Sequence, residues 1–119
     1  MDENNSRRIS EAELTVLETL WDAGEALPAK AIQESLKARR GWERTTVRSL
    51  ITRLADKGTL NVDRSSDVAV YTPTFGREEY AWDLTEVLLH RLYKDDGKAL
   101  VAALMAHEAF KVADLANMK

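Results

Sequence analysis

Cysteine is absent from the 119 residues, and proline and histidine occur twice each. Without cysteine the chain can form no disulfide, thiolate metal site or cysteine nucleophile. His90 and His107 lack the short spacing of metal-binding motifs, so we expect structural roles for both. The sequence also contains no glycine-rich phosphate loop and no G-x-S-x-G elbow. We therefore expect no cofactor, no metal and no catalytic activity.

Long hydrophobic runs are also missing. No run approaches the ~20 apolar residues of a membrane-spanning helix, and residues 1–8 lack the apolar core of a signal peptide. We therefore expect a cytoplasmic protein without a membrane partner. With 45% hydrophobic and 31% charged residues, the composition fits one or two small folded domains.

The net charge of −3 conceals an uneven distribution of charge. Residues 28–64 carry nine Lys or Arg and four Asp or Glu, whereas residues 1–27 carry two and seven, and residues 65–119 carry six and nine. Such a focused basic segment attracts phosphate, while acidic flanks discourage indiscriminate binding. This distribution favours a nucleic-acid partner for residues 28–64.

The segment from Trp42 to Gly58 has the pattern of an amphipathic helix. Four apolar residues recur at the i, i+3, i+4 and i+7 spacing that turns one face toward a core. They are Val47, Leu50, Ile51 and Leu54. The opposite face offers guanidinium and hydroxyl groups, so we expect an acidic ligand there; the alternative is an ordinary surface helix with solvated arginines. The predicted DNA-binding residues are Arg44, Thr45, Thr46, Arg48, Ser49, Thr52, Arg53 and, beyond the helix, Arg64.

After Gly58 the pattern changes from helical to alternating, which predicts a β-hairpin with strands near residues 60–63 and 68–72. Gly58 stands where a helix end favours a residue able to adopt positive φ. Arg64 lies at the expected tip. There it either reaches a phosphate or a minor groove, or protects an exposed strand edge against pairing.

Two helices are predicted before this element. The first begins at a capping box formed by Ser10 and Glu13 and ends at Gly24. The second occupies residues 28–40. Trp42 is expected to fill the junction between the second and third helices, with stacking on DNA as the less favoured alternative. Three helices followed by a hairpin, in about 65 residues, predict a winged helix-turn-helix.

Helical periodicity returns after Pro73, with one helix expected near residues 77–93 and a shorter one after Gly97. The apolar stripes of these helices exceed what two short helices can bury. We predict that they pair with a second chain; packing on the winged unit is the alternative. The predicted dimerisation residues are Leu84, Val87, Leu88, Leu92, Leu100, Val101 and Leu104. The predicted fold is mainly α with a small β-hairpin, divided into a DNA-binding domain (1–74) and a helical dimerisation region (75–119).

Four blocks of sequence stand in a characteristic order. They are residues 10–21, T-T-V-R-S-L-I-T-R-L-A-D-K-G at 45–58, Y-T-P at 71–73 and R-E-E-Y at 77–80. Over about residues 9–110 the chain resembles the penicillinase-repressor family of bacterial regulators (BlaI/MecI/CopY type). The resemblance implies a homodimeric transcriptional repressor that reads a palindromic operator. It assigns the reading block to Thr45, Thr46, Arg48 and Arg53, with backbone contacts from the wing.

Two departures from the family pattern concern induction. The copper-responsive branch carries a C-terminal cysteine motif, which is absent here, so copper sensing by that route is excluded. The β-lactam-responsive branch is cleaved at an Asn-Phe bond, and the aligned position here is Ala103-Leu104. The residues of this chain therefore do not specify whether a sensor protease or another inducer relieves repression.

The function predicted from these features is sequence-specific transcriptional repression by a homodimer bound to double-stranded operator DNA. The alternative is a winged-helix module that binds another protein instead of DNA. The exposed face of the third helix distinguishes the two, because exposed Leu or Phe would favour a protein partner. Arg and Thr at these positions favour DNA.

Overall fold

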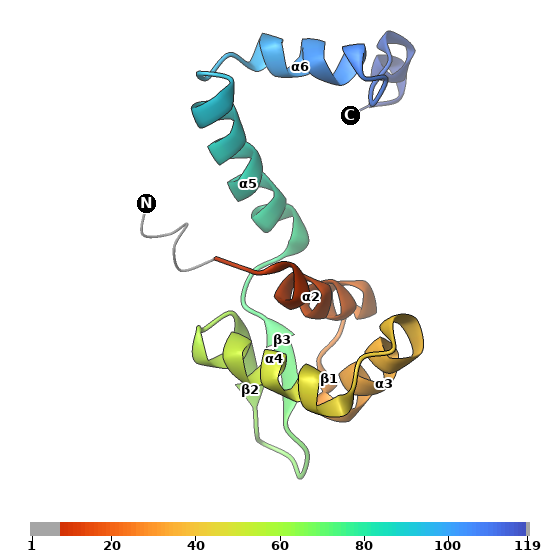
Figure 1. The fold of residues 1–119 in the computed structure, drawn as a ribbon, viewed down its shortest axis with the longest axis vertical. Helices are drawn as coiled ribbons and strands as arrows, with labels where there is room; N and C mark the ends of the chain where they lie inside the picture. The colour runs from red at the N-terminus through yellow and green to blue at the C-terminus, as the bar shows by residue number, and fades with distance from the viewer. Residues whose placement is uncertain (1–7, 119) are drawn as a thin grey trace. The chain divides into compact units, whose positions relative to one another are not determined.

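The computed structural model describes residues 8–118, so most of the polar segment 1–8 lies outside the described residues. Figure 1 shows the ribbon. The elements are α2 (Glu11–Ala23), β1 (Leu27–Pro28), α3 (Ala29–Arg40), α4 (Arg44–Asp56), β2 (Leu60–Asp63), β3 (Val70–Pro73), α5 (Arg77–Leu92), α6 (Gly97–Ala106) and the 3₁₀ helix η1 (Val112–Asn117). The predicted fold class, mainly helical with a small β-hairpin, is confirmed. Within residues 8–118, none of the helices combines the length and hydrophobicity needed to cross a membrane.

Helix α2 begins at the predicted capping box. The Glu13 N–H donates to Ser10 Oγ at 3.1 Å, and the Ser10 N–H donates to Glu13 Oε1 at 2.9 Å. These bonds satisfy two donors that a helix start otherwise leaves unpaired. Gly24 ends α2 with φ 70°, a left-handed conformation that glycine adopts without strain from a Cβ atom.

The core lies where α2, α3 and α4 turn their apolar faces toward one another. Its helical members are Val16, Leu17, Leu20, Ile32, Leu36, Val47, Leu50, Ile51 and Leu54, none of them more than 4% exposed. The predicted apolar stripe of α4 is therefore wholly buried. Each such side chain contributes about 1.5–3 kcal/mol when removed from water, which fixes the rotation of α4 about its axis.

The sheet has three antiparallel strands in the order β1-β3-β2. Tyr71 in the central strand pairs with Leu27 on one side and Val62 on the other. The prediction missed β1, whose two residues are too few to show alternation. It also started the second hairpin strand too early, because residues 68–69 belong to the turn before β3.

The chain forms two compact units, and the first runs past residue 74 as far as Tyr80. An aromatic cluster of Trp21, Phe75 and Tyr80 accounts for this. Its ring centroids lie 5.8–6.3 Å apart, and Trp21 Nε1 donates to the Phe75 carbonyl oxygen at 3.0 Å. Burial raises the pKa of the Tyr80 hydroxyl. The first turn of α5 is thus part of the winged unit.

The second unit begins at Ala81 and contains the rest of α5, α6 and η1. None of its described residues is buried. Of the predicted dimerisation residues, Leu84, Leu88, Leu92, Val101 and Leu104 are exposed, while Val87 and Leu100 are half-buried. The exposed fraction reaches 72% at Leu92. Within this unit alone, the apolar stripes remain in contact with water.

Candidate nucleic-acid interface

The exposed face of α4 carries the residues predicted to read DNA. All seven of those that lie on α4 are exposed, whereas the four apolar residues of the opposite face are buried; the seven are Arg44, Thr45, Thr46, Arg48, Ser49, Thr52 and Arg53. Burial of one face leaves the other face directed outward by helix geometry alone. The outward face presents guanidinium groups and hydroxyls, which are donors suited to phosphate oxygens and base edges.

A groove of about 400 Å³ lies beside this face, between α3 and α4. It is lined by Ala29, Lys30, Gln33, Glu34, Lys37, Arg44 and Arg48. Four of these side chains are cationic and one is a carboxylate, so the groove favours an anionic ligand. The prediction missed Lys30 and Lys37. Their spacing of seven residues, which places both on one side of α3 away from buried Ile32 and Leu36, could have revealed them.

Other basic residues of the segment 28–64 are held by the domain itself. Arg39 Nη2 donates to the Thr19 hydroxyl of α2 at 2.9 Å. The Arg40 guanidinium lies 5.9 Å from the Trp42 ring centroid, within the range of a cation–π contact. Some cations of the basic segment therefore line the groove, whereas Arg39 and Arg40 make contacts within the fold.

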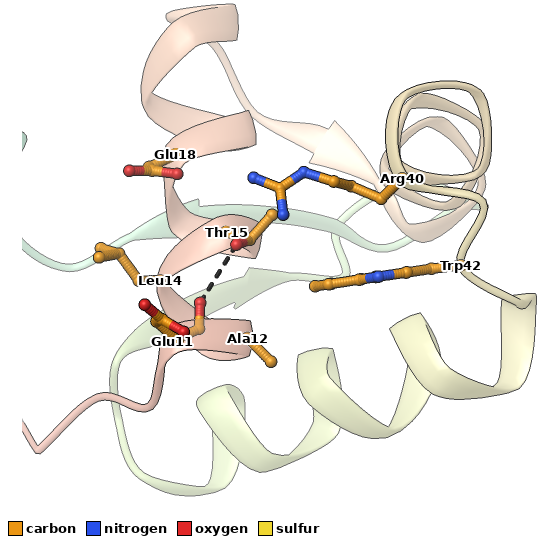
Figure 2. Close-up of a pocket in the computed structure, with 7 residues that line it drawn as sticks. All are labelled: Glu11, Ala12, Leu14, Thr15, Glu18, Arg40 and Trp42. Atoms are coloured by element: carbon orange, nitrogen blue, oxygen red, sulfur yellow. Dashed lines mark hydrogen bonds between the residues drawn. The ribbon is translucent and has the colours of Figure 1, made fainter.

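Figure 2 shows Trp42 and Arg40 on the wall of a separate pocket of about 420 Å³. The pocket is also lined by Ala12 and Thr15 of α2. Trp42 is half-buried, packs against the core and donates its backbone N–H to the Leu36 carbonyl oxygen at 3.4 Å. This is the junction position predicted for Trp42. The Trp42 side chain extends toward α2 (Figure 2), and the Arg40 guanidinium lies over its ring, which does not favour the alternative of stacking on DNA.

Arg53 and Lys57 both contact a carboxylate that the helical pattern did not reveal. Glu13 Oε2 accepts from Arg53 Nε at 3.0 Å, and Glu13 Oε1 accepts from Lys57 Nζ at 2.7 Å. Glu13 is 2% exposed. Burial acts to raise its pKa, but hydrogen bonds from Lys57, the Ser10 N–H and Arg53 outweigh burial and hold the pKa below its ordinary value. Arg53, predicted to contact DNA, therefore bonds to α2 in this structure.

The turn of the wing begins at Asp63, the last residue of β2. The Ser65 N–H donates to Asp63 Oδ1 at 2.9 Å, and the hydrogen bonds from Ser65 lower the pKa of this carboxyl group. Arg64 follows Asp63 and is exposed. The turn therefore presents one long cationic side chain at the start of the hairpin tip.

The two histidines lie in the second unit. His90 Nδ1 is 3.1 Å from Asp95 Oδ2 in an exposed pair, and His107 follows the last residue of α6. In the described part of the chain, no three His, Asp or Glu side chains cluster in a way that could hold a metal ion.

Three packed helices, a hairpin wing and a basic groove beside the third helix define a winged-helix DNA-binding regulator. The model of the penicillinase repressor family matches residues 9–119, and the chain belongs to this family. Repression of transcription is the function of this family, which is not a family of enzymes.

Known relatives resemble the chain over most of its length. The penicillinase repressor of Bacillus licheniformis is 28% identical over 101 residues, which cover 85% of this chain and 78% of that protein. The methicillin resistance regulatory protein MecI of Mammaliicoccus sciuri is 26% identical over 106 residues, covering 89% and 85%. A solution structure of the monomeric form of Bacillus licheniformis BlaI with the blaP half-operator has a TM-score of 0.53 and 30% identity, covering 60% of this chain and 87% of that one.

Proposed function

We propose that the chain is a homodimeric repressor that reads a palindromic operator through α4. The observation that carries this proposal is the division of α4 between a buried apolar face and an exposed face of Arg, Thr and Ser. A helix of this kind fits the major groove, where Arg pairs with guanine and hydroxyls contact several bases. Arg48 and Thr45 are the residues we assign to base edges or adjacent phosphates.

The cations around α4 are assigned to the DNA backbone. Lys30 and Lys37 line the groove beside Arg44 and Arg48, and Arg64 is exposed on the wing. Contacts to phosphate fix the orientation of a protein on the duplex without reading sequence. We therefore propose that Lys30, Lys37 and Arg64 orient the protein on the duplex, whereas the outward face of α4 recognises the base sequence.

The second unit is assigned to dimerisation. Its exposed leucines and valines are the kind of surface that an obligate homodimer buries. The relative solved with a half-operator is in its monomeric form, which supports the assignment of one winged unit to each half-site. Two linked units would then read a palindrome with a spacing set by the DNA helical turn.

Induction by a protease would require α6 to open. The bond that aligns with the family cleavage position, Ala103-Leu104, lies within α6 (Gly97–Ala106). Leu104 is 41% exposed and Ala103 is half-buried. Cleavage inside a helix proceeds through local unfolding, so stability of α6 would limit the rate for any sensor protease.

A repressor of this kind acts where the bacterial chromosome lies, in the cytoplasm.

A protein-binding module is less well supported. The large apolar residues of α4 are all buried, and its exposed face contains none. A protein partner at this face would have to be recognised through arginines and hydroxyls alone, whereas interface cores are typically apolar and depleted of charge.

The proposed function is tested by a mobility-shift assay with DNA from upstream of the chain's own gene, in the presence of random-sequence competitor. We expect retardation of the upstream fragment at protein concentrations that leave random DNA unbound. The log of the affinity should fall linearly with the log of salt concentration. Equal affinity for both DNAs, or binding that salt does not change, would contradict the proposal.

A further inference from the structure

Glu13 is a buried carboxylate with two cationic partners from another helix. It lies in the first turn of α2, whereas Arg53 and Lys57 lie at the C-terminal end of α4. The Lys57 ammonium also donates to the Arg8 carbonyl oxygen at 2.6 Å. A buried carboxylate is stable only with such compensation. The cluster therefore ties the end of the DNA-reading helix to the start of α2.

We propose that Glu13 is a specificity-determining residue, which holds Arg53 and Lys57 against α2 and thereby withholds two cations from DNA. This inference rests on the proposed DNA-binding function. The cations of the groove have different surroundings from Arg53 and Lys57. The groove is lined by four cations, Lys30, Lys37, Arg44 and Arg48, and by one carboxylate. The Arg53 side chain is 58% exposed while it bonds to Glu13, so loss of the Glu13 charge would release a guanidinium group that already lies at the surface.

Sequence-independent affinity depends on the number of phosphates that a protein neutralises. Each phosphate adds about 0.9 to the slope of log affinity against log salt. In an operator complex, base contacts fix the pose of α4, so additional cations at its C-terminal end add little. Random DNA imposes no such pose. Withholding two cations therefore weakens random binding more than operator binding, which is how Glu13 sharpens specificity.

The variant Glu13→Gln tests this role with little change in shape. Glutamine also serves in a capping box, so the bond from the Ser10 N–H can be retained. The matched control is Glu11→Gln, which removes one negative charge from the same helical turn. Glu11 is exposed, and within residues 8–118 its carboxylate makes no ion pair with a basic side chain.

The measurement is fluorescence anisotropy of a short random-sequence duplex with the full chain, over a salt series. We expect Glu13→Gln to bind several-fold more tightly at low salt than wild type, with a slope steeper by roughly 0.9 for each cation that reaches a phosphate. Glu11→Gln should keep the wild-type slope. Adding Arg53→Gln to Glu13→Gln should remove part of the increase. A purely structural role for Glu13 would weaken binding without steepening the slope.

A second comparison does not depend on the folding of Glu13→Gln. Arg53→Gln alone should keep the wild-type slope, because that cation is already occupied, whereas Arg48→Gln should flatten it by roughly 0.9. The inference is overturned if Arg53→Gln flattens the slope as much as Arg48→Gln, or if folded Glu13→Gln keeps the wild-type slope. Wild-type protein that shows no salt-dependent binding would instead refute the proposed function.

Discussion

Arg48 combines two properties that no other residue of the outward face of α4 shares, because Arg44, which also lines the groove, only flanks that face. It stands on the face opposite the buried stripe, and it lines the groove beside Lys30 and Lys37. We expect Arg48→Ala to cost about 1–3 kcal/mol of operator affinity. Lys57→Ala should cost less, because Lys57 bonds to Glu13. Anisotropy titrations at fixed salt measure both, and unchanged affinity in a folded Arg48→Ala variant would remove this residue from DNA recognition.

The Glu13 carboxyl should make stability sensitive to acid. In the folded chain its pKa lies below the ordinary value of 4.5, because the hydrogen bonds from Lys57, Ser10 and Arg53 outweigh burial. The folded state therefore binds fewer protons at this group than the unfolded state. Its contribution to stability is fully present above pH 4.5 and is lost as pH falls through the folded pKa.

We therefore expect the free energy of unfolding of wild type to fall more steeply with acidification than that of Glu13→Gln. Urea denaturation at about pH 6 and about pH 3.5 measures the difference. Exposed Glu11→Gln serves as the control and should follow wild type. Parallel losses of stability in wild type and Glu13→Gln would show that this carboxyl group titrates alike in both states.

Helical periodicity was sufficient to predict the outward direction of Thr45, Arg48, Ser49 and Thr52, because burial of the opposite stripe fixes it. The same reasoning could not predict the bond from Arg53 to Glu13, which lies 40 residues earlier in the sequence. Periodicity describes one helix and contains no information about which side chain of another helix reaches it. The spacing of Lys30 and Lys37 could place both on one side of α3, but only the packing of α3 on α4 brings them beside Arg44.

Among the helices and strands, two local signals gave correct predictions: the capping residues of helices and the periodicity of apolar residues. The capping box of α2 and the φ of 82° at Gly58 confirm the predicted helix start and helix end. Strand β1 was missed because pairing with β3, not local alternation, defines its two residues. Contacts between segments that are distant in the sequence also place Phe75 and Tyr80 in the first unit, beyond the boundary predicted at residue 74.

The aromatic cluster of Trp21, Phe75 and Tyr80 predicts how far the winged unit can be shortened. A fragment ending at Tyr80 retains the contacts of Trp21 with Phe75 and Tyr80, whereas one ending at Thr74 loses both partners. Burial of each aromatic side chain contributes about 1.5–3 kcal/mol. We expect a clearly lower unfolding midpoint for the shorter fragment in thermal denaturation followed by circular dichroism. Equal midpoints would show that the aromatic cluster contributes little to the unit.

The longer fragment should also bind DNA, but more weakly and with less sequence preference than the full chain, because one half-site is lost. Its affinity should still fall with salt, since Lys30, Lys37, Arg44 and Arg48 all remain. Anisotropy titrations over a salt series measure both properties. Binding of a folded fragment that is indifferent to salt would contradict the assignment of these cations to phosphates.

For the whole molecule, the decisive surface is the apolar stripe of α5. Leu84, Leu88 and Leu92 recur every four residues and are 54%, 38% and 72% exposed. We expect Leu88→Asp to place an unpaired carboxylate in the proposed dimer interface, at a cost of several kcal/mol. The variant should sediment as a monomer at concentrations where wild type is a dimer, and its operator affinity should fall although α4 is unchanged.

The control for this variant is Glu86→Gln, which changes one charge on the opposite side of the same helix. It should remain dimeric. Circular dichroism checks that Leu88→Asp is folded. A folded Leu88→Asp dimer, or wild type that is monomeric at micromolar concentration, would mean that the stripe is not the dimer interface.

Sedimentation velocity of the complex shows whether two copies of this chain bind one operator. The duplex is the upstream segment protected by the protein, labelled so that its sedimentation can be followed during titration with wild type. We expect saturation at two chains per duplex, with little complex of one chain per duplex before saturation. A fully bound duplex that carries a single chain, at the affinity of the full operator, would contradict binding by two copies.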